Sequence, residues 1–258
     1  MSYCVGLRLN KGLVFMSDTR TNAGVDNFST FQKMFTWSKP GERFITVLTA
    51  GNLATTQTVI SLLDERTKAP ADRNPSIMTA PSIFQVARMI GQTLRDVIQD
   101  SVASGQEATS TFDATIILGG QIETSEPRLF LIYPEGNFIE ASEDTPYFQS
   151  GETKYGRPIL VRAFDPDMAF EDAIKLLMVS FDSTIKANLS VALPLDWHIY
   201  ESDSMRNGRI GRIDRDDPYF ETISNGNFSP LARMARTSSS FCRSWPLASS
   251  RSPARRCA

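Results

Sequence analysis

The first 20 residues constrain the fold more than any other stretch of this chain. Two short apolar segments, Tyr3–Leu9 and Leu13–Ser17, flank Asn10-Lys11-Gly12, whose residue types favour a tight turn. This pattern predicts a β-hairpin. A small hydroxyl residue, Ser2, stands directly before the hairpin, and an acid, Asp18, directly follows it. The hairpin is therefore expected to return Asp18 toward the start of the chain.

The rest of the chain predicts sheets with segregated helices. Helical spacing of apolar residues predicts one helix that starts at Asn52, a second around Ile83–Ile98 and a third over Phe170–Ala187. Strand patterns cover residues 29–37, 43–49, 114–118, 128–133, 136–141, 197–200 and 208–213. The order is strands, two helices, strands, one helix and strands. It indicates an α+β fold, with two sheets packed face to face and helices outside.

Length and composition favour one main domain followed by a different tail. The chain has 258 residues and is 41% hydrophobic, which is enough for a single large core. Residues 1–228 are expected to form this domain. Residues 229–258 hold six Arg, eight Ser and no acid, so we expect a disordered or non-native tail. The alternative is a basic arm that binds nucleic acid or a membrane, although neither aromatic interleaving nor an amphipathic period supports it.

The composition also indicates a cytoplasmic protein without nucleic-acid or membrane partners. The net charge of −2 does not indicate nucleic-acid binding, and no apolar run is long enough to span a membrane. The three cysteines, Cys4, Cys242 and Cys257, form no disulfide framework. The start of the chain lacks the pattern of a signal peptide. Aminopeptidases usually remove Met before a small residue, so Ser2 is expected to carry the α-amino group.

Ser2, Asp18 and Lys33 are the candidate catalytic residues. A serine hydroxyl is a weak nucleophile that needs a base, and a free α-amine has an ordinary pKa of about 7.7–8.0. Lys33 beside it would lower the α-amine pKa and stabilise charge on the nucleophile, and Asp18 would hold Lys33 in place. The other interpretation is structural: serine is common at position 2, and Asp18 and Lys33 form an ordinary ion pair.

Other reactive side chains favour structural roles. His198 is the only histidine, and it lies in an apolar strand-like run, which favours a structural histidine over a catalytic one. Cys4 lies in the first predicted strand and is expected to be a packing residue. No His and Cys cluster has metal-ligand spacing and no glycine-rich phosphate loop is present, so neither metal nor cofactor is expected.

Several segments together resemble proteasome β-type subunits. The opening Val5-Gly6, Gly12-Leu13-Val14 and Ser17-Asp18-Thr19-Arg20 is similar to the start of that family, and Lys33 follows at about the family's distance. Residues 49–54 and Ser150-Gly151 resemble two further family segments. The bacterial Anbu (ancestral beta subunit) family is the most similar group, on residues 3–7, 180–184, 188–194 and 216–220. The resemblance spans roughly residues 2–227.

The resemblance implies a four-layer αββα sandwich of the N-terminal-nucleophile hydrolase type and threonine-type peptidase chemistry. Ser2 takes the role of nucleophile and α-amino base, although most relatives begin with Thr. The roles of Asp18 and Lys33 follow those given above. The other implied site residues are Arg20, which supports the Asp18 loop, Gly51, whose N–H donates to the oxyanion, and Ser150 and Ser190, which lie near the α-amine. The family's acid near Ser190 has no clear match, because Ala187 stands at the expected spacing and Asp182 lies earlier.

The sequence thus predicts a proteasome-like peptidase that assembles into a homo-oligomeric ring or open helical stack and hydrolyses peptides or unfolded proteins. Two alternatives stay open on the same fold. One is an amidase for small substrates, and the other is a catalytically silent, self-assembling scaffold subunit. Whether Met1 is removed distinguishes the catalytic hypotheses from the scaffold, because Ser2 has a free amine only after that removal.

Overall fold

The computed structural model describes residues 2–22, 28–68, 75–103 and 112–225. The chain consists of two compact units, Met1–Ser224 and Asn225–Ala258. The fold described below belongs to the first unit. The predicted tail, residues 229–258, lies outside the described residues.

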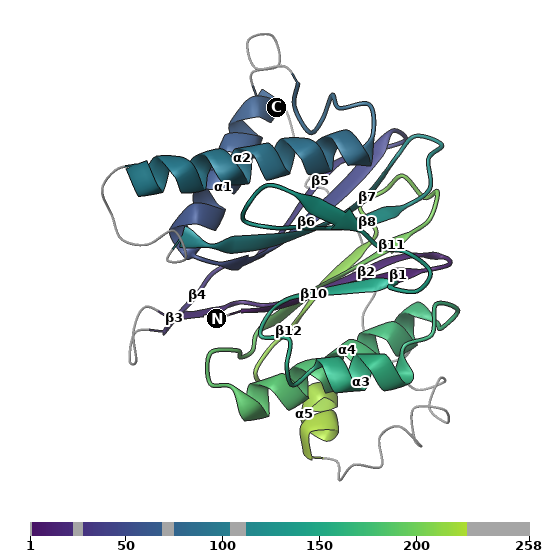
Figure 1. The fold of residues 1–258 in the computed structure, drawn as a ribbon. Coiled ribbons are helices and arrows are strands. Elements are labelled where there is room, and N and C mark those ends of the chain that lie inside the picture. Colours follow the sequence, from purple (N-terminus) through teal and green to yellow (C-terminus); the bar gives the residue numbers. More distant parts are fainter. Residues whose placement is uncertain (1, 23–27, 69–74, 104–111, 226–258) are drawn as a thin grey trace, which may run out of the picture. The chain divides into compact units, whose positions relative to one another are not determined.

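Two five-stranded antiparallel sheets lie face to face at the centre of the fold (Figure 1). The first sheet contains, in spatial order, β10 (Tyr147–Gly151), β1 (Tyr3–Leu9), β2 (Gly12–Asp18), β11 (Leu195–Glu201) and β12 (Arg209–Ile213). The second contains β5 (Met34–Lys39), β6 (Arg43–Gly51), β7 (Ala114–Ile122), β8 (Arg128–Ile132) and β9 (Phe138–Glu140). A separate two-stranded ribbon pairs β3 (Arg20–Asn22) with β4 (Phe28–Thr30).

Helices cover the outer face of each sheet, which completes the four-layer αββα sandwich (Figure 1). The helices α1 (Leu53–Lys68) and α2 (Ile83–Ala103) cover the second sheet. On the first sheet lie α3 (Arg157–Ala163), α4 (Phe170–Ala187) and α5 (Pro218–Asn225). No helix in the described ranges is long and apolar enough to cross a membrane. The predicted α+β sandwich is confirmed.

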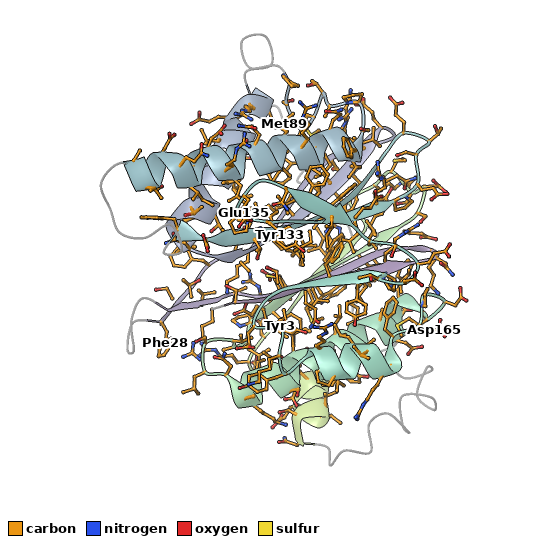
Figure 2. All side chains as sticks on the ribbon, in the orientation of Figure 1. Tyr3, Phe28, Met89, Tyr133, Glu135 and Asp165 are labelled. Atoms are coloured by element: carbon orange, nitrogen blue, oxygen red, sulfur yellow. The ribbon has the colours of Figure 1, made fainter. Side chains whose placement is uncertain are left out.

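Side-chain alternation along β1 lets this strand pack against the helices on one face and against the second sheet on the other. Tyr3 points toward the helices, and its ring lies 4.4 Å from that of Phe181 on α4 (Figure 2). Cys4 points the other way, into a buried cluster between the sheets that includes Phe15 and Phe44. Because successive residues of a strand face opposite sides, apolar residues at both parities bury this sheet on both faces.

The predicted hairpin and most helices agree with the structure, and one predicted strand is wrong. The hairpin forms with Cys4 opposite Ser17, and α4 has the predicted bounds. Residues 29–37 do not form one strand, because β4 pairs with β3 whereas β5 pairs with β6. The chain changes its pairing partner at residues 31–33, which interrupts the strand. The elements β10, α3 and α5 were not predicted.

Candidate active site

Ser2 lies at the start of β1 and is held there through its backbone. Its carbonyl oxygen accepts a hydrogen bond from the Glu152 N–H at 2.7 Å, and the residue is only 7% exposed. Gly151 precedes Glu152 with φ of +83°, and a Cβ at this glycine would overlap the Ser2 carbonyl oxygen. Glycine is needed here for both backbone conformation and space. The segment after β10 therefore fixes the start of β1, while Met1 lies outside the described residues.

Asp18 joins the start of the chain to Lys33. Its Oδ1 atom accepts hydrogen bonds from the Tyr3 N–H at 2.9 Å and from Lys33 Nζ at 2.8 Å. The Lys33 and Asp18 side chains are 4% and 0% exposed. The hairpin brings Asp18 back to the residue that follows Ser2, as the sequence predicts. The structure thus places Ser2 beside a buried ion pair.

Burial controls the electrostatics of this pair. Removal from water raises the pKa of Asp18, while the charge and hydrogen bond of Lys33 and the Tyr3 and Arg20 N–H groups oppose that rise. Asp18 Oδ2 is buried without a hydrogen-bond partner in the described part of the chain. A buried carboxylate is costly unless it is paired, so Lys33 is the main group that keeps Asp18 charged.

Lys33 lies in the break between β4 and β5 rather than within a strand. The expectation that it lies within a strand over residues 29–37 is therefore wrong. Its carbonyl accepts the Thr49 N–H at 2.9 Å, and its ammonium also donates to the Arg20 carbonyl at 2.5 Å. Leaving the strand frees the lysine backbone to reach β6 while its side chain reaches Asp18. Among the described residues, no hydrogen bond joins Lys33 to the Ser2 hydroxyl.

Arg20 contacts the site through its backbone and not through its charge. Its carbonyl accepts from Lys33, and its guanidinium lies 3.7 Å from the centre of the Phe28 ring. Figure 2 shows Phe28 at the end of the fold where the chain begins. Cation–π contact of this kind holds the side chain against β4. Arg20 thereby fixes the segment that orients Lys33.

Gly51 ends β6 at the same end of the two sheets. Its φ is +117°, and a Cβ would overlap the backbone of Asp113. Gly51 is exposed, opposite Ala114 on β7. The next residue, Asn52, caps α1 by accepting the Thr55 N–H at 3.1 Å. This strand-to-helix corner demands glycine for steric reasons and leaves it open to solvent.

Ser150 and Ser190 are nearby but do not contact Ser2 directly. Ser150 is buried opposite Cys4 on β10, and its hydroxyl is hydrogen-bonded to that of Thr115 on β7. Ser190 follows α4, and its N–H donates to Asn188 Oδ1 at 2.9 Å. Within the described ranges no hydrogen bond links either serine to Ser2. Their placement near the α-amine therefore stays a prediction.

Sequence reasoning missed three residues at this site: Thr115, Glu152 and Asn188. Glu152 binds Ser2 through its N–H and accepts the Asn188 side-chain amide at 2.7 Å through its carboxylate. These contacts join segments that are far apart in the chain, so no local pattern predicts them. The one local signal was Ser150-Gly151, because the glycine marks a close backbone approach.

The two other reactive residues have the structural roles predicted for them. His198 is buried on β11, and burial lowers its pKa to about 4. Cys4 is buried too, its thiol donates weakly to the Thr49 carbonyl at 3.5 Å, and burial raises its pKa. A low thiolate population makes Cys4 a poor nucleophile.

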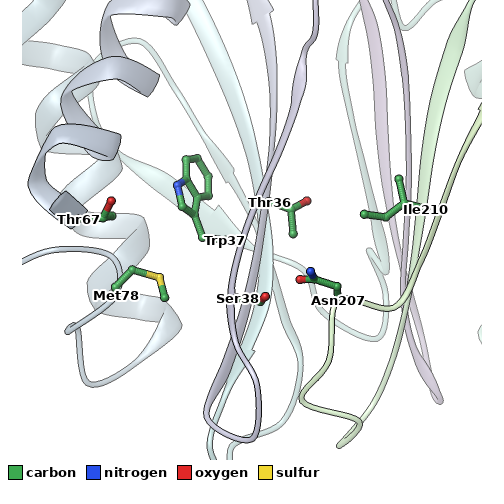
Figure 3. A pocket seen from close by; sticks show the side chains of 7 residues that line it. All are labelled: Thr36, Trp37, Ser38, Thr67, Met78, Asn207 and Ile210. Carbon is green, nitrogen blue, oxygen red and sulfur yellow. The ribbon is translucent and has the colours of Figure 1, made fainter. Parts of the chain in front are cut away.

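An open hollow of ≈ 610 Å³ lies away from this cluster, along the edge strands β5 and β12 (Figure 3). Trp37, Met78 and Asn207 are among its lining residues, and none of the seven predicted site residues is. Asp18, Lys33 and Ser2 therefore define the candidate active site, and this hollow is separate from it.

The arrangement at the start of β1 has a defined chemical capacity. A serine with a free α-amine carries both a nucleophile and a base on one residue. A buried lysine ammonium next to it stabilises negative charge that develops during attack on a carbonyl. Acyl transfer is the reaction class that uses these groups.

Comparison with known proteins identifies the family of this chain. Residues 2–191 match the proteasome subunit family. The structure is similar to Anbu (ancestral beta-subunit) from Yersinia bercovieri, with 45% identity, a TM-score of 0.81 and coverage of 91% of this chain and 97% of that one. Anbu from Hyphomicrobium sp. strain MC1 has 45% identity, a TM-score of 0.80 and coverage of 95% and 99%.

A third solved structure is described as a helical assembly of the Anbu complex from Pseudomonas aeruginosa. It has 43% identity to this chain, a TM-score of 0.82 and coverage of 90% of this chain and 95% of that one. A comparison with curated proteins gives no match. Because the family match spans most of the chain and the structural matches exceed 40% identity, this protein belongs to the proteasome subunit family, within its Anbu group.

Proposed function

We propose that this protein is a proteasome-related peptidase that uses Ser2 as its nucleophile once Met1 has been removed. The Ser2 hydroxyl oxygen attacks the carbonyl carbon of a peptide or amide bond, and the Ser2 α-amine takes the hydroxyl proton. The C–N bond then breaks, and the proton passes to the departing amine. Water hydrolyses the resulting ester on Ser2, which releases the acid and restores the hydroxyl.

The other site residues support this chemistry in separate ways. Lys33 provides positive charge beside the nucleophile, and Asp18 keeps it charged and in place. Arg20 holds the Asp18 and Lys33 segments through its backbone, and the Gly51 N–H donates to the oxyanion; a donor of this kind contributes about 2.7–4 kcal/mol in the transition state. Ser150 and Ser190 line the surroundings of the α-amine.

One observation carries the proposal: Asp18 Oδ1 accepts hydrogen bonds both from the Tyr3 N–H, which follows Ser2, and from Lys33 Nζ. An ordinary surface ion pair would not be buried against the second peptide of the chain. Ser2 in place of Thr also has a consequence. Serine lacks the methyl group that restricts the hydroxyl rotamer, so we expect slower or less selective turnover than with Thr.

We further propose that the protein self-associates, acts on peptides or unfolded proteins, and works in the cytoplasm. The related Pseudomonas aeruginosa protein forms a helical assembly, which supports a homo-oligomeric ring or an open helical stack here. Such an assembly would restrict access to the active site to unfolded chains. This is a physical requirement for a peptide-bond hydrolase that shares a compartment with folded proteins.

Intact mass and probe labelling test the proposal together. We expect the purified protein to lack Met1, and a β-lactone or epoxyketone probe to label Ser2. Labelling should disappear in Ser2→Ala and persist in Ser61→Ala, a control on the exposed face of α1. Retained Met1 would rule out the catalytic proposal. A processed, assembled protein that resists labelling would favour the scaffold, and cleavage of small amides without peptides would favour the amidase.

A further inference from the structure

Glu152 contacts the start of the chain and a distant segment at the same time. Its N–H donates to the Ser2 carbonyl at 2.7 Å, and its Oε2 atom accepts from Asn188 Nδ2 at 2.7 Å. Its Oε1 atom accepts the Lys154 N–H at 3.2 Å. Both carboxylate oxygens are therefore occupied by donors. A side chain held at both oxygens has little freedom to rotate, so its backbone is fixed as well.

Asn188 uses both ends of its amide in this arrangement. Its nitrogen donates to Glu152, and its Oδ1 atom accepts the Ser190 N–H at 2.9 Å. Asn188 also caps the end of α4, since its own N–H donates to the Thr184 carbonyl at 2.8 Å. The amide is thus anchored to a helix that packs against β1 and β2. The support for Glu152 comes from a rigid element and not from a free loop.

Gly151 brings this support close to Ser2. Any Cβ at Gly151 would overlap the Ser2 carbonyl oxygen, so the Glu152 N–H reaches that oxygen only because the preceding residue is glycine. The hydrogen bond from Tyr3 to Asp18 holds the other side of the Ser2 backbone. Two neighbouring backbone bonds thus restrict the same residue from two elements.

We infer that the Glu152 carboxylate and the Asn188 amide form a clamp that positions Ser2 for reaction, an inference that rests on the function proposed for Ser2. Glu152 is a positioning residue: it acts through its own N–H on the Ser2 carbonyl. Because the hydroxyl and the α-amine both belong to Ser2, a rotation of its backbone displaces nucleophile and base together. Misplacement of reacting groups by about 1 Å can lower a rate on the order of a hundredfold.

The clamp can be broken and rebuilt by exchanging its two side chains. Glu152→Gln places an amide next to the Asn188 amide, and Asn188→Asp places a second carboxylate next to Glu152. In the double variant Glu152→Gln/Asn188→Asp, the new glutamine donates to the new aspartate. Its oxygen still accepts the Lys154 N–H, and the aspartate still accepts the Ser190 N–H. The double variant therefore retains each hydrogen bond and the net charge.

The measured quantity is the rate of covalent labelling of Ser2 by a β-lactone probe in the full-length, assembled protein. We expect each single variant to lower the maximal labelling rate about tenfold or more, with the probe's half-saturating concentration changed less than about threefold. The double variant should recover most of the rate. Glu135→Gln is the control, because Glu135 is exposed in the turn between β8 and β9 (Figure 2). Ser2 in this variant should be labelled at the rate of the unaltered protein.

Hydrogen exchange of the peptide that contains Glu152 gives a readout that does not need activity. The single variants should exchange the Glu152 N–H faster, and the double variant should restore its protection, even if unaltered Ser2 does not react. If the unaltered protein is not labelled but the variants show this exchange pattern, the proposed function is rejected and the clamp is still supported. Single variants with normal labelling and normal exchange, or a double variant that recovers neither, would overturn the clamp.

Discussion

At the scale of single residues, the candidate site depends on buried charges and on backbone atoms that are held by hydrogen bonds. Asp18 and Lys33 are buried together, and each has a second contact, to the Tyr3 N–H and the Arg20 carbonyl respectively. Among the described residues the Ser2 hydroxyl has no hydrogen-bond partner, and Ser2 is held by its backbone. The residues that surround the nucleophile are thus fixed more firmly than its hydroxyl.

Lys33→Met should destabilise the fold and abolish labelling of Ser2. It leaves the Asp18 carboxylate buried without its cation, which costs about 3–5 kcal/mol of unfolding free energy. Adding Asp18→Asn should recover much of this stability without restoring the reaction. Denaturant unfolding and probe labelling measure the two effects, and Lys68→Met, at the exposed end of α1, is the control. Labelling that survives in Lys33→Met would contradict the role of Lys33.

Gly151→Ala should have two effects: the strain of alanine in a left-handed backbone conformation, and a steric displacement of Ser2. Gly41 offers a matched comparison, because its φ of +79° is close to the +83° of Gly151 and a Cβ there would meet no atom within 4 Å. Alanine in the left-handed region costs about 1–2 kcal/mol at either site. Only Gly151→Ala also displaces the Ser2 carbonyl, so we expect a larger drop in melting temperature and a tenfold or greater loss of labelling. Equal behaviour of the two variants would exclude a steric role at Ser2.

At the scale of elements, predictions succeeded where a segment's own pattern decides its structure. The hairpin follows from apolar strands around a turn, and α4 follows from its apolar stripe. The prediction of one strand over residues 29–37 was wrong. Its residue types suit a strand throughout, but the segment pairs with two different partners, which divides it into β4 and β5. β10 and α3 were missed because segments of five and seven residues are too short for a periodic pattern to stand out.

His198 links the two sheets and gives the fold a pH dependence. Its ring on β11 is within hydrogen-bond distance of the Thr36 and Thr46 hydroxyls at 3.3 and 3.2 Å, on β5 and β6 of the other sheet. Its pKa is lowered to about 4, against 6.5 for an ordinary histidine, because burial disfavours the charged ring. The unfolded chain therefore binds more protons between these values, so stability falls as the pH falls from about 6.5 to about 4.

This histidine contributes up to about 3 kcal/mol to that loss of unfolding free energy. His198→Gln should flatten the slope of stability against pH over this interval. The single imidazole in the chain also makes a direct measurement possible, since one NMR resonance should titrate near pH 4 in the folded protein. Titration near the ordinary value, or an unchanged slope in His198→Gln, would contradict this account.

At the scale of the whole molecule, α5 is the last described element, and it packs onto the rest of the domain. Phe220 on α5 is buried, and Lys186 on α4 donates to the Ser224 carbonyl at 2.5 Å. Asp217 caps α5 by accepting the Phe220 N–H at 2.8 Å. These contacts make α5 part of the domain and are consistent with the proposed boundary at residue 228.

Truncation after residue 228 should therefore leave unfolding free energy within about 0.5 kcal/mol of that of the full chain, with unchanged labelling of Ser2. A second truncation after residue 216 removes α5 and should cost about 3 kcal/mol or more, because a buried Phe is lost. Thermal unfolding and sedimentation of both proteins measure stability and assembly. A marked loss in the first truncation would place residues 229–258 within the functional protein.

The sequence by itself determined the hairpin, the main helices and the α+β class, because local periodicity and turn residues specify these features. The family followed from the resemblance of several short segments to known members. It also indicated Ser2, Asp18 and Lys33 as candidate catalytic residues, and the resemblance added Gly51. Tertiary structure alone decided the break before Lys33, the pairing of Ser150 with Thr115, and the contact of Glu152 with Ser2 and Asn188. Those contacts join segments up to some 150 residues apart, and only the packing of the two sheets and α4 brings them within hydrogen-bond distance.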